Sequence, residues 1–498
     1  MRIAAALALA SALALGPAPA SLRAEPAPSA SVPNPVLARG AAFVAAVNDT
    51  SADSRKRAAL DLFSESTRHV VPEEKIVALF QRLHDEYAPL EYHHSEAPGR
   101  SLHVFARKHG TRLWRDFQFR YDTEPPHRLT QLVFIAEVAE PVYLPNSALA
   151  SPEALAWLNG YVDKLVREDD LSGALLVARG DSVLFQRYFG HEDAGRSRPV
   201  RAETRFNLGS GNKMFTALVV MRLVEEGKLR LDQPISEFFP DFPDTHVTKA
   251  ITIRQLLAHS SGLGDYLTEA FERDGRRATR LEEFVPFAYA EFRANGSYFA
   301  PGSEHRYSNT GFLLLGRIIE TITGKDYYDV VRETIYAPLG MSRTDHYLAD
   351  GSVPDLARPL TRAPADSGAT PGEGSWVEAP HGLRGTSAGG GFSTCADILR
   401  FARALVAGRV VSPAALAAMT TPQPPLEGAM SAYGLGFLLE SSLGGRLSFG
   451  HGGTAPGVNF EFRYFPDDDV TLIVFGNQDN GAYDDLRKNV TKLVTGDR

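Results

Sequence analysis

Ser210 and Lys213 are the residues of this chain whose types and spacing could carry out nucleophilic chemistry. They open an apolar-rich segment, and this pattern predicts a helix that starts near Ser210 and stops at Gly227. Residues three apart share a helix face, so the amine of Lys213 can reach the hydroxyl of Ser210. A serine hydroxyl needs a neighbouring base, and lysine serves only when it is neutral. Burial and the positive end of a helix both lower the pKa of a lysine, and the same helix end leaves backbone N–H groups free to stabilise an oxyanion.

The spacing of Ser210 and Lys213 alone also fits a capping serine followed by a surface lysine. Lys213 is, however, the only lysine of the chain with a serine three residues before it. Two further groups follow in order: Tyr307-Ser-Asn309 opens an apolar helix, and His451-Gly-Gly453 comes just before the last strands. Taken singly, Tyr307 would be a packing tyrosine and His451 a turn histidine. The ordered set of three motifs points to a catalytic site.

These three motifs resemble those of the serine β-lactamase and penicillin-binding protein superfamily, which carries Ser-x-x-Lys as a signature. The resemblance is to the branch that contains class C β-lactamases, D-amino-acid-specific peptidases and related esterases, and it covers about 155–495. The sequence around the motifs is also similar to that branch. The similar segments are 227–234 (Gly-Lys-Leu-Arg-Leu-Asp-Gln-Pro), 256–262 (Leu-Leu-Ala-His-Ser-Ser-Gly), 338–341 (Pro-Leu-Gly-Met) and 389–394 (Gly-Gly-Gly-Phe-Ser-Thr). The implied fold is an antiparallel sheet flanked by helices, together with a helical region.

By this resemblance Ser210 is the acylated nucleophile. Lys213 and Tyr307 share the role of the base, and the sequence leaves open which of them takes the proton, because a tyrosine that contacts a lysine can itself ionise. Asn309 is implied to hold both Lys213 and an amide of the substrate. No metal or organic cofactor is needed for this chemistry.

The third motif is implied to bind the substrate. Gly452 and Gly453 would let the strand backbone pass close to the ligand, and the N–H groups of Thr454 and Ser210 would form the oxyanion hole. His451 stands where many relatives carry lysine, and histidine is only partly charged near neutral pH. A glycine also replaces a hydroxyl that would bond a substrate carboxylate. Both departures weaken the binding of a substrate carboxylate, so they favour an esterase or peptidase-like hydrolase over efficient β-lactam hydrolysis.

Two other candidate nucleophiles are weaker. One matches the nucleophile-elbow motif of α/β-hydrolases, Gly385-Thr-Ser387-Ala-Gly389. In those enzymes the motif directly follows a buried strand, and the residues before Gly385 are not expected to form a strand. Cys395 is the only cysteine, so an intrachain disulfide is excluded, and we expect a buried small apolar residue there.

The composition describes a large globular protein. The chain has 498 residues, 44% of them hydrophobic, and a net charge of -8 without long charged runs. Nucleic acid and anionic membranes are therefore not expected partners. Residues 1–24 have a positive start, an apolar run too short to span a membrane and small-residue cleavage sites, which predicts a signal peptide and export to the periplasm or the medium. Residues 25–34 read as a disordered linker. No stable membrane insertion is expected, and the oligomeric state stays open.

A small α+β accessory domain is predicted over 35–145. Its helices are expected at 35–47, 54–63 and 72–87, and its strands at 102–108, 112–121 and 128–137. Helices followed by an antiparallel meander resemble the cone-shaped folds related to nuclear transport factor two. His93, His94, His103 and Trp114 could line a pocket, although sheet-face packing explains them as well. We assign this domain no chemistry.

The hydrolase domain is predicted over 151–498, which makes the whole chain an α+β protein. Its expected elements are helices at 151–167, 251–263, 310–322, 393–405 and from 482, a hairpin of strands 174–179 and 183–190, strands 459–465 and 470–477, and a long loop at 350–382. The predicted activity is a serine hydrolase that forms an acyl-enzyme with an ester, amide or peptide-like substrate. The alternatives are a β-lactamase or penicillin-binding carboxypeptidase, and a non-catalytic binding or sensor protein on the same fold.

Overall fold

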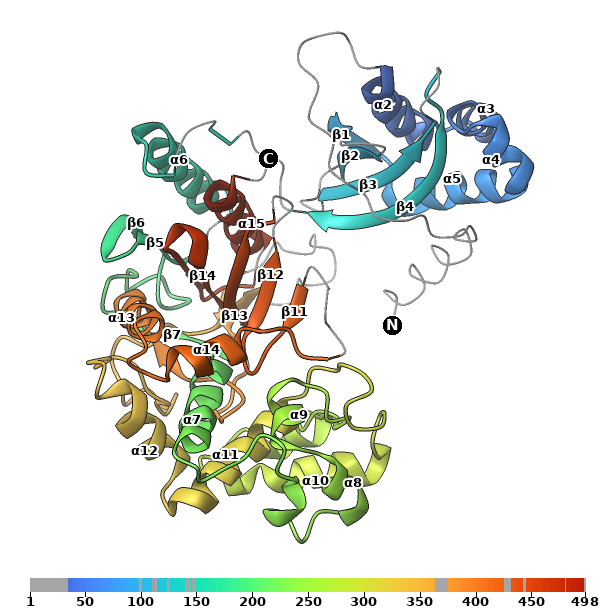
Figure 1. Ribbon diagram of the computed structural model, residues 1–498. Coiled ribbons are helices and arrows are strands. Elements are labelled where there is room, and N and C mark those ends of the chain that lie inside the picture. The colour runs from blue at the N-terminus through green and yellow to red at the C-terminus, as the bar shows by residue number, and fades with distance from the viewer. Residues whose placement is uncertain are drawn as a thin grey trace. The chain divides into compact units, whose positions relative to one another are not determined.

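The structure is a computed structural model of the chain (Figure 1). It describes residues 35–97, 101–109, 111, 114–122, 126–138, 144–145, 149–169, 171–362, 375–424, 431–441, 445–479 and 481–496. The predicted signal peptide (1–24) and linker (25–34) lie outside these residues. The chain divides into two compact units, 1–143 and 144–498, and each holds its own core.

The first unit packs helices against one four-stranded antiparallel sheet of order β1-β2-β3-β4. Its elements are α2 (Pro35–Asn48), α3 (Ala52–Leu62), α4 (Glu65–Val70), α5 (Glu73–Tyr87), β1 (Leu90–Glu96), β2 (Ser101–Lys108), β3 (Trp114–Tyr121) and β4 (Leu129–Val138). The prediction missed β1, because Glu91, His93 and His94 break the apolar alternation of a strand. The likeness to cone-shaped folds stays a prediction.

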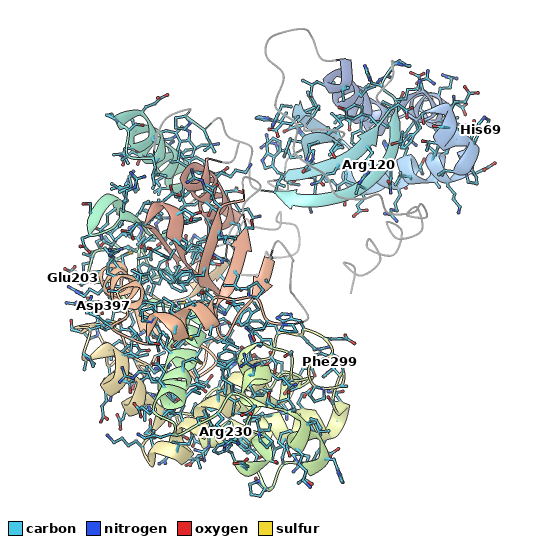
Figure 2. All side chains as sticks on the ribbon, viewed as in Figure 1. His69, Arg120, Glu203, Arg230, Phe299 and Asp397 are labelled. Atoms are coloured by element: carbon cyan, nitrogen blue, oxygen red, sulfur yellow. The ribbon has the colours of Figure 1, made fainter. Side chains whose placement is uncertain are left out.

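Aromatic side chains hold this first unit together. Phe43 of α2 contacts Phe80 of α5 and both Phe117 and Phe119 of β3, with ring centroids 4.8–5.8 Å apart. On the opposite face of the sheet, His103 lies 2.8 Å from the carboxylate of Asp116. Figure 2 shows the side chains of both units, including the exposed Arg120 on β3.

The second unit is built on a seven-stranded antiparallel sheet of order β11-β12-β13-β14-β15-β5-β6. The strands are β5 (Gly173–Arg179), β6 (Ser182–Phe189), β11 (Ser431–Tyr433), β12 (Leu438–Ser441), β13 (Leu447–Ala455), β14 (Val458–Phe465) and β15 (Val470–Gly476). The predicted hairpin is confirmed as β5 and β6, which turn at Gly180. Strands from both ends of this unit therefore meet in one sheet, with β15 beside β5.

Helices cover this sheet and form a separate helical region (Figure 1). They are α6 (Pro152–Asp169), α7 (Lys213–Glu225), α8 (Thr245–Ala250), α9 (Ile253–Leu257), α10 (Val285–Asn295), α11 (Asn309–Thr323), α12 (Tyr327–Val331), α13 (Cys395–Val406), α14 (Pro413–Met419) and α15 (Gly481–Thr495). α15 contacts both α6 and the sheet, while Phe401 of α13 packs on Phe462 of β14.

Two sequence expectations need correction. The helix predicted over 251–263 ends at Leu257, because the chain turns at His259, whose φ is +56°. The segment 350–382 is not loop throughout, since β8 (Leu360–Arg362) pairs with β9 (Trp376–Glu378). Residues 363–374 of that segment lie outside the described part.

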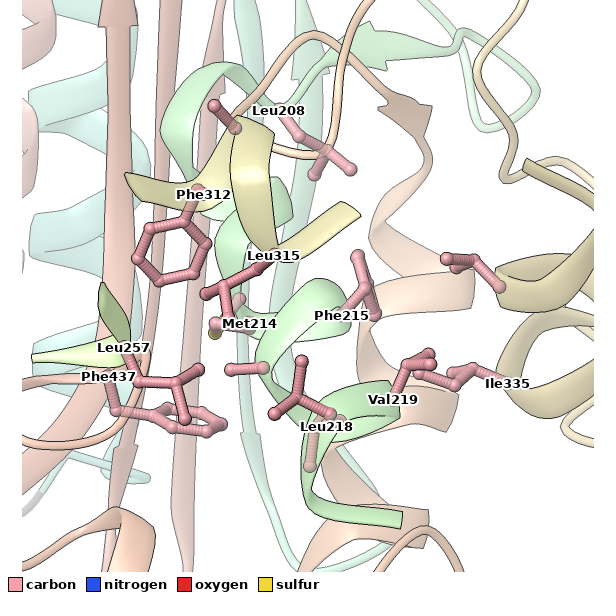
Figure 3. Close-up of a cluster of buried hydrophobic side chains, with 14 of the residues drawn as sticks. Leu208, Met214, Phe215, Leu218, Val219, Leu257, Phe312, Leu315, Ile335 and Phe437 are labelled. Atoms are coloured by element: carbon pink, nitrogen blue, oxygen red, sulfur yellow. The ribbon is translucent and has the colours of Figure 1, made fainter. Parts of the chain in front are cut away.

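Helix α7 lies at the centre of the second unit (Figure 3). Ten of its 13 residues are buried, so apolar side chains leave it in every direction. Met214 and Phe215 lie at its start, and they pack among side chains such as Phe312 of α11 and Phe437. A helix enclosed on all sides has little freedom to shift, so the residues at its N-terminal end are held firmly.

Candidate active site

Ser210 lies in one 3₁₀ turn, Gly209–Asn212, between the short strand β7 (Phe206–Asn207) and α7. The predicted helix start near Ser210 is therefore corrected by three residues, since the α-helix begins at Lys213. Gly209 has a φ of +47°, a left-handed conformation that glycine adopts without strain. Its N–H donates to the side-chain oxygen of Asn207 at 2.8 Å. This turn places the Ser210 side chain beside the first residue of the buried helix.

The amine of Lys213 is fully buried and has three partners. Its Nζ lies 3.2 Å from Ser210 Oγ, 2.6 Å from Asn309 Oδ1 and 2.6 Å from the carbonyl oxygen of Ala388. The structure thus brings the first two motifs together, although 96 residues separate Lys213 from Asn309.

The orientation of the Asn309 amide follows from Asp265. Asn309 Nδ2 donates to the Asp265 carboxylate at 2.7 Å, and a carboxylate only accepts. The oxygen of the same amide must therefore face Lys213. Sequence reasoning missed Asp265, and its expectation that Asn309 also holds an amide of the substrate stays a prediction. The spacing of Asp265 in the sequence carries no signal of this contact.

Burial lowers the pKa of Lys213 to about 7, while the charge of Asp265 acts in the opposite direction. Burial raises the pKa of Tyr307, and the nearby Ser210 side chain opposes that shift. The two groups that sequence reasoning could not separate therefore differ in protonation near neutral pH. A large fraction of Lys213 is neutral, and Tyr307 keeps its proton.

Tyr307 lies beside the lysine with 37% of its surface exposed. Lys213 Nζ stands 4.6 Å from the centre of its ring. The ring packs on His259 with centroids 4.1 Å apart, and His259 Nδ1 accepts a hydrogen bond from the N–H of Ser308. These contacts hold Tyr307 at the mouth of the site.

His451 lies on β13 near Tyr307, with 6.4 Å between ring centroids, but only 1% of it is exposed. Burial, followed by the nearby Lys213, lowers its pKa to about 3. Its Nε2 pairs with the hydroxyl of Tyr433 at 2.9 Å. The histidine that we expected to be partly charged is therefore neutral, so it supplies no fixed positive charge for a substrate carboxylate.

The backbone of β13 passes directly against the turn Gly209–Asn212, which holds Ser210. A Cβ on Gly453 would lie 2.0 Å from the carbonyl oxygen of Leu208 and 2.9 Å from the nitrogen of Ser210. A Cβ on Gly209 would in turn lie 3.1 Å from the nitrogen of Thr454. Only glycine permits this approach, which brings the backbone nitrogens of Ser210 and Thr454 to the same side of the site. Gly452 lies on the opposite side of the strand, against Glu461.

The two rival nucleophiles are placed away from this chemistry. Ser387 is fully buried, and its hydroxyl packs where a Cβ on Gly316 would be. The neighbouring Ala388 nevertheless supplies the carbonyl that holds Lys213, a contribution that sequence reasoning missed. Cys395 is buried at the start of α13, and burial raises the pKa of its thiol to about 12.

Among the residues that the structure describes, no group of three or more histidine, cysteine, aspartate or glutamate side chains is arranged to hold a metal ion. Within the same residues, no helix combines the length and apolar character needed to cross a membrane.

Comparison with known proteins identifies the class. The family model described as Beta-lactamase matches residues 158–496, and the chain therefore belongs to this family. Penicillin-binding protein 4* of Bacillus subtilis (strain 168) is 30% identical over 330 residues, which cover 64% of this chain and 70% of that protein. Esterase EstB of Burkholderia gladioli is 34% identical over 204 residues, or 39% of this chain and 52% of the esterase. The D-amino acid amidase of Ochrobactrum anthropi SV3, complexed with D-phenylalanine, matches at a TM-score of 0.58 and 26% identity, with 68% of this chain and 99% of that chain covered.

Proposed function

We propose that this protein is a serine hydrolase that cleaves ester or amide substrates through an acyl-enzyme on Ser210. The observation that carries the proposal is the set of hydrogen bonds around Lys213. A neutral amine has two N–H donors and one lone pair. Asn309 Oδ1 and the Ala388 carbonyl are pure acceptors, so they take both donors. The lone pair is left for the third neighbour, Ser210 Oγ at 3.2 Å, which is the arrangement of a general base and its nucleophile.

The reaction then follows from the geometry. Ser210 Oγ attacks the carbonyl carbon while its proton passes to Lys213 Nζ. The developing oxyanion accepts hydrogen bonds from the backbone N–H groups of Ser210 and Thr454. The leaving alcohol or amine takes this proton from Lys213, either directly or by relay through the hydroxyl of Tyr307, which is reprotonated by Lys213. Water then releases the acyl group in a second, equivalent cycle. Gly453 lets β13 lie against the turn that holds Ser210, so that a substrate bound at Ser210 lies beside this strand.

The substrate class follows from the charges of the site. The histidine of the third motif is neutral, and Asp265 lies beyond Asn309, so no permanent cation faces Ser210 from these motifs. We therefore propose neutral ester or amide groups, as in an esterase or a D-amino-acyl peptidase, rather than substrates with a free carboxylate. The names of the esterase and amidase relatives support this choice. Export through the segment 1–24 is part of the proposal.

The decisive experiment is to incubate the protein with a fluorophosphonate probe and, separately, with a labelled penicillin, and to locate the modified residue by mass spectrometry. We expect the fluorophosphonate to label Ser210 and the penicillin to form no stable adduct. Ser182, an exposed serine on β6, provides a matched control, since Ser182→Ala must keep the label that Ser210→Ala loses. Stable labelling by both probes would instead indicate a penicillin-binding peptidase. No labelling of Ser210 would favour a binding protein that turns over nothing.

The pKa of Lys213 predicts how the rate depends on pH. The lysine acts as a base only when neutral, so kcat/KM for a neutral ester should be constant above about pH 7 and should fall tenfold per pH unit below it. Tyr307, with its raised pKa, keeps its proton throughout this range. The measurement is kcat/KM from pH 4.5 to 9 with a substrate that does not titrate. An acid limb centred near pH 4 would show that a carboxylate is the base and would contradict the proposal.

A further inference from the structure

The two acceptors of Lys213 belong to distant parts of the chain. Asn309 is the first residue of α11, and Ala388 lies in the glycine-rich loop before β10 (Phe392–Ser393). The lone pair of Lys213 points at Ser210 only while both acceptors keep their places. Both of them are reached from a single tripeptide, Gly264-Asp265-Tyr266, which follows α9.

Asp265 holds the first acceptor. Its Oδ2 accepts a hydrogen bond from Asn309 Nδ2 at 2.7 Å and a longer one from the backbone N–H of Asn309 at 3.4 Å. Rotation of the Asn309 amide by 180° would place its NH2 against the amine of Lys213 and its oxygen against the carboxylate. The oxygen would then repel the carboxylate, and the NH2 would occupy the lone pair of Lys213 that should face Ser210. Asp265 therefore permits only the orientation that serves Lys213.

Tyr266 holds the second acceptor. Its hydroxyl is 3.0 Å from Thr386 Oγ1, and the same oxygen accepts a hydrogen bond from the N–H of Ala388 at 3.1 Å. The Tyr266 ring is 4% exposed and packs edge-on against Phe271 and Phe284. Ala388, the residue whose carbonyl meets Lys213, is therefore tied through Thr386 to a buried aromatic cluster.

The backbone of the tripeptide is itself anchored. Ser308 Oγ, which caps α11, donates to the carbonyl oxygen of Gly264 at 2.6 Å. Gly264 also packs closely on Glu291 of α10, since a Cβ there would lie 2.1 Å from a carboxylate oxygen of that side chain. The segment is thus tied to α11 by the Ser308 hydrogen bond and packs against α10.

We propose that Asp265 and Tyr266 are positioning residues that hold the two hydrogen-bond acceptors of Lys213, so that its lone pair faces Ser210. This inference rests on the proposed function, and it adds a segment outside the three motifs to the acylation machinery. Neither residue touches the reacting atoms. Each acts through one partner, Asp265 through Asn309 and Tyr266 through the Thr386–Ala388 loop.

The test for Asp265 uses two variants. Asp265→Ala removes the acceptor, and we expect kcat/KM to fall about 10- to 100-fold, the range for losing a charge-assisted hydrogen bond. Asp265→Asn keeps an oxygen toward Asn309 Nδ2 but removes the charge, so its loss should be smaller. The other titratable groups facing Lys213 are His259, His451 and Tyr307, and all three are uncharged near pH 7. In Asp265→Asn the acid limb should therefore move to lower pH, since this carboxylate acts to raise the pKa of Lys213.

The test for Tyr266 is Tyr266→Phe, which keeps the ring contacts and removes the hydroxyl. We expect kcat/KM to fall about 3- to 10-fold with the acid limb unmoved, because no charge is lost. The pair formed by Tyr289 and Asp241, whose side chains are 3.3 Å apart elsewhere in the helical region, supplies matched controls. Tyr289→Phe and Asp241→Asn should retain the kcat/KM and the pH profile of the parent protein.

The outcomes separate this inference from the proposed function. If Ser210 takes the fluorophosphonate in the parent protein, but Asp265→Ala keeps the parent kcat/KM and Asp265→Asn keeps the parent acid limb, the positioning role is wrong and the hydrolase stands. If the parent protein neither hydrolyses esters nor labels at Ser210, the proposed function itself fails. A purely structural role for Asp265 would lower the melting temperature and leave the acid limb where it was.

Discussion

Ser210→Ala is expected to abolish hydrolysis, with kcat falling by about 10⁴-fold or more, the size of effect seen when a nucleophilic serine is removed. The variant lacks the only oxygen that can form the acyl-enzyme in this mechanism. Its fold should be unchanged, because Ser210 lies in a turn stabilised by backbone contacts and its hydroxyl contacts the amine of Lys213 rather than the core. The measurement is steady-state hydrolysis of a neutral ester together with the thermal melting curve.

The interpretation of Ser210→Ala depends on two controls. The melting temperature must match that of the parent protein, and Ser182→Ala must keep full activity. Unchanged turnover in a normally folded Ser210→Ala variant would reject the acyl-enzyme mechanism outright. A loss of activity accompanied by a lower melting temperature would call for Ser210→Gly, which removes the same hydroxyl from a turn that already contains two glycines.

Lys213→Met should slow acylation by about 10³-fold or more, because Ser210 then loses its base and general-base catalysis with correct positioning is worth at least this much. Methionine keeps the length and apolar stem of the buried side chain and removes the amine. Lys213→Ala should be at least as slow, but it also leaves a cavity. Acylation is measured directly, as the rate of fluorophosphonate labelling and as the burst of product from an activated ester.

Tyr307→Phe separates the two bases between which the sequence could not decide. With the pKa of Lys213 near 7 and that of Tyr307 raised, we expect Tyr307→Phe to retain more acylation activity than Lys213→Met. Lys228→Met, at an exposed lysine, controls for the loss of a positive charge. Parent-like acylation in Lys213→Met combined with a collapse in Tyr307→Phe would assign the base to the tyrosine.

The fold was predictable where local patterns are strong. The sequence indicated α6, the β5–β6 hairpin, β14, β15 and α15, because each shows clear periodicity or a tight turn signal. It predicted a helix at α9 that continued past Leu257, and it did not indicate the pairing of β8 with β9. Those depend on where the chain meets distant segments: His259 turns the chain so that its ring packs on Tyr307, and β8 pairs across a 13-residue interval that has little apolar alternation.

The site was predictable only in part, for a related reason. Ser210, Lys213, Tyr307 and Asn309 belong to motifs of fixed local spacing, and the structure brings these four residues together. Asp265 bonds to Asn309, which is 44 residues away from it, and the Ala388 carbonyl reaches the lysine directly across 175 residues. A backbone carbonyl has no sequence signature at all. The neutral state of His451 likewise follows from its burial beside Tyr433, which residue type does not reveal.

The burial of Lys213 lowers the free energy of unfolding. A lysine whose pKa drops from 10.5 to about 7 binds its proton less tightly in the folded than in the unfolded chain. By linkage, the folded state should gain stability as pH rises from about 7 to about 10.5, and below pH 7 it bears the full penalty, of the order of 5 kcal/mol. The net stability of a protein is about 5 to 15 kcal/mol, so this penalty equals a third of it or more, and the remaining core must offset it. The same burial that makes Lys213 able to accept a proton near neutral pH therefore lowers the stability of the folded state.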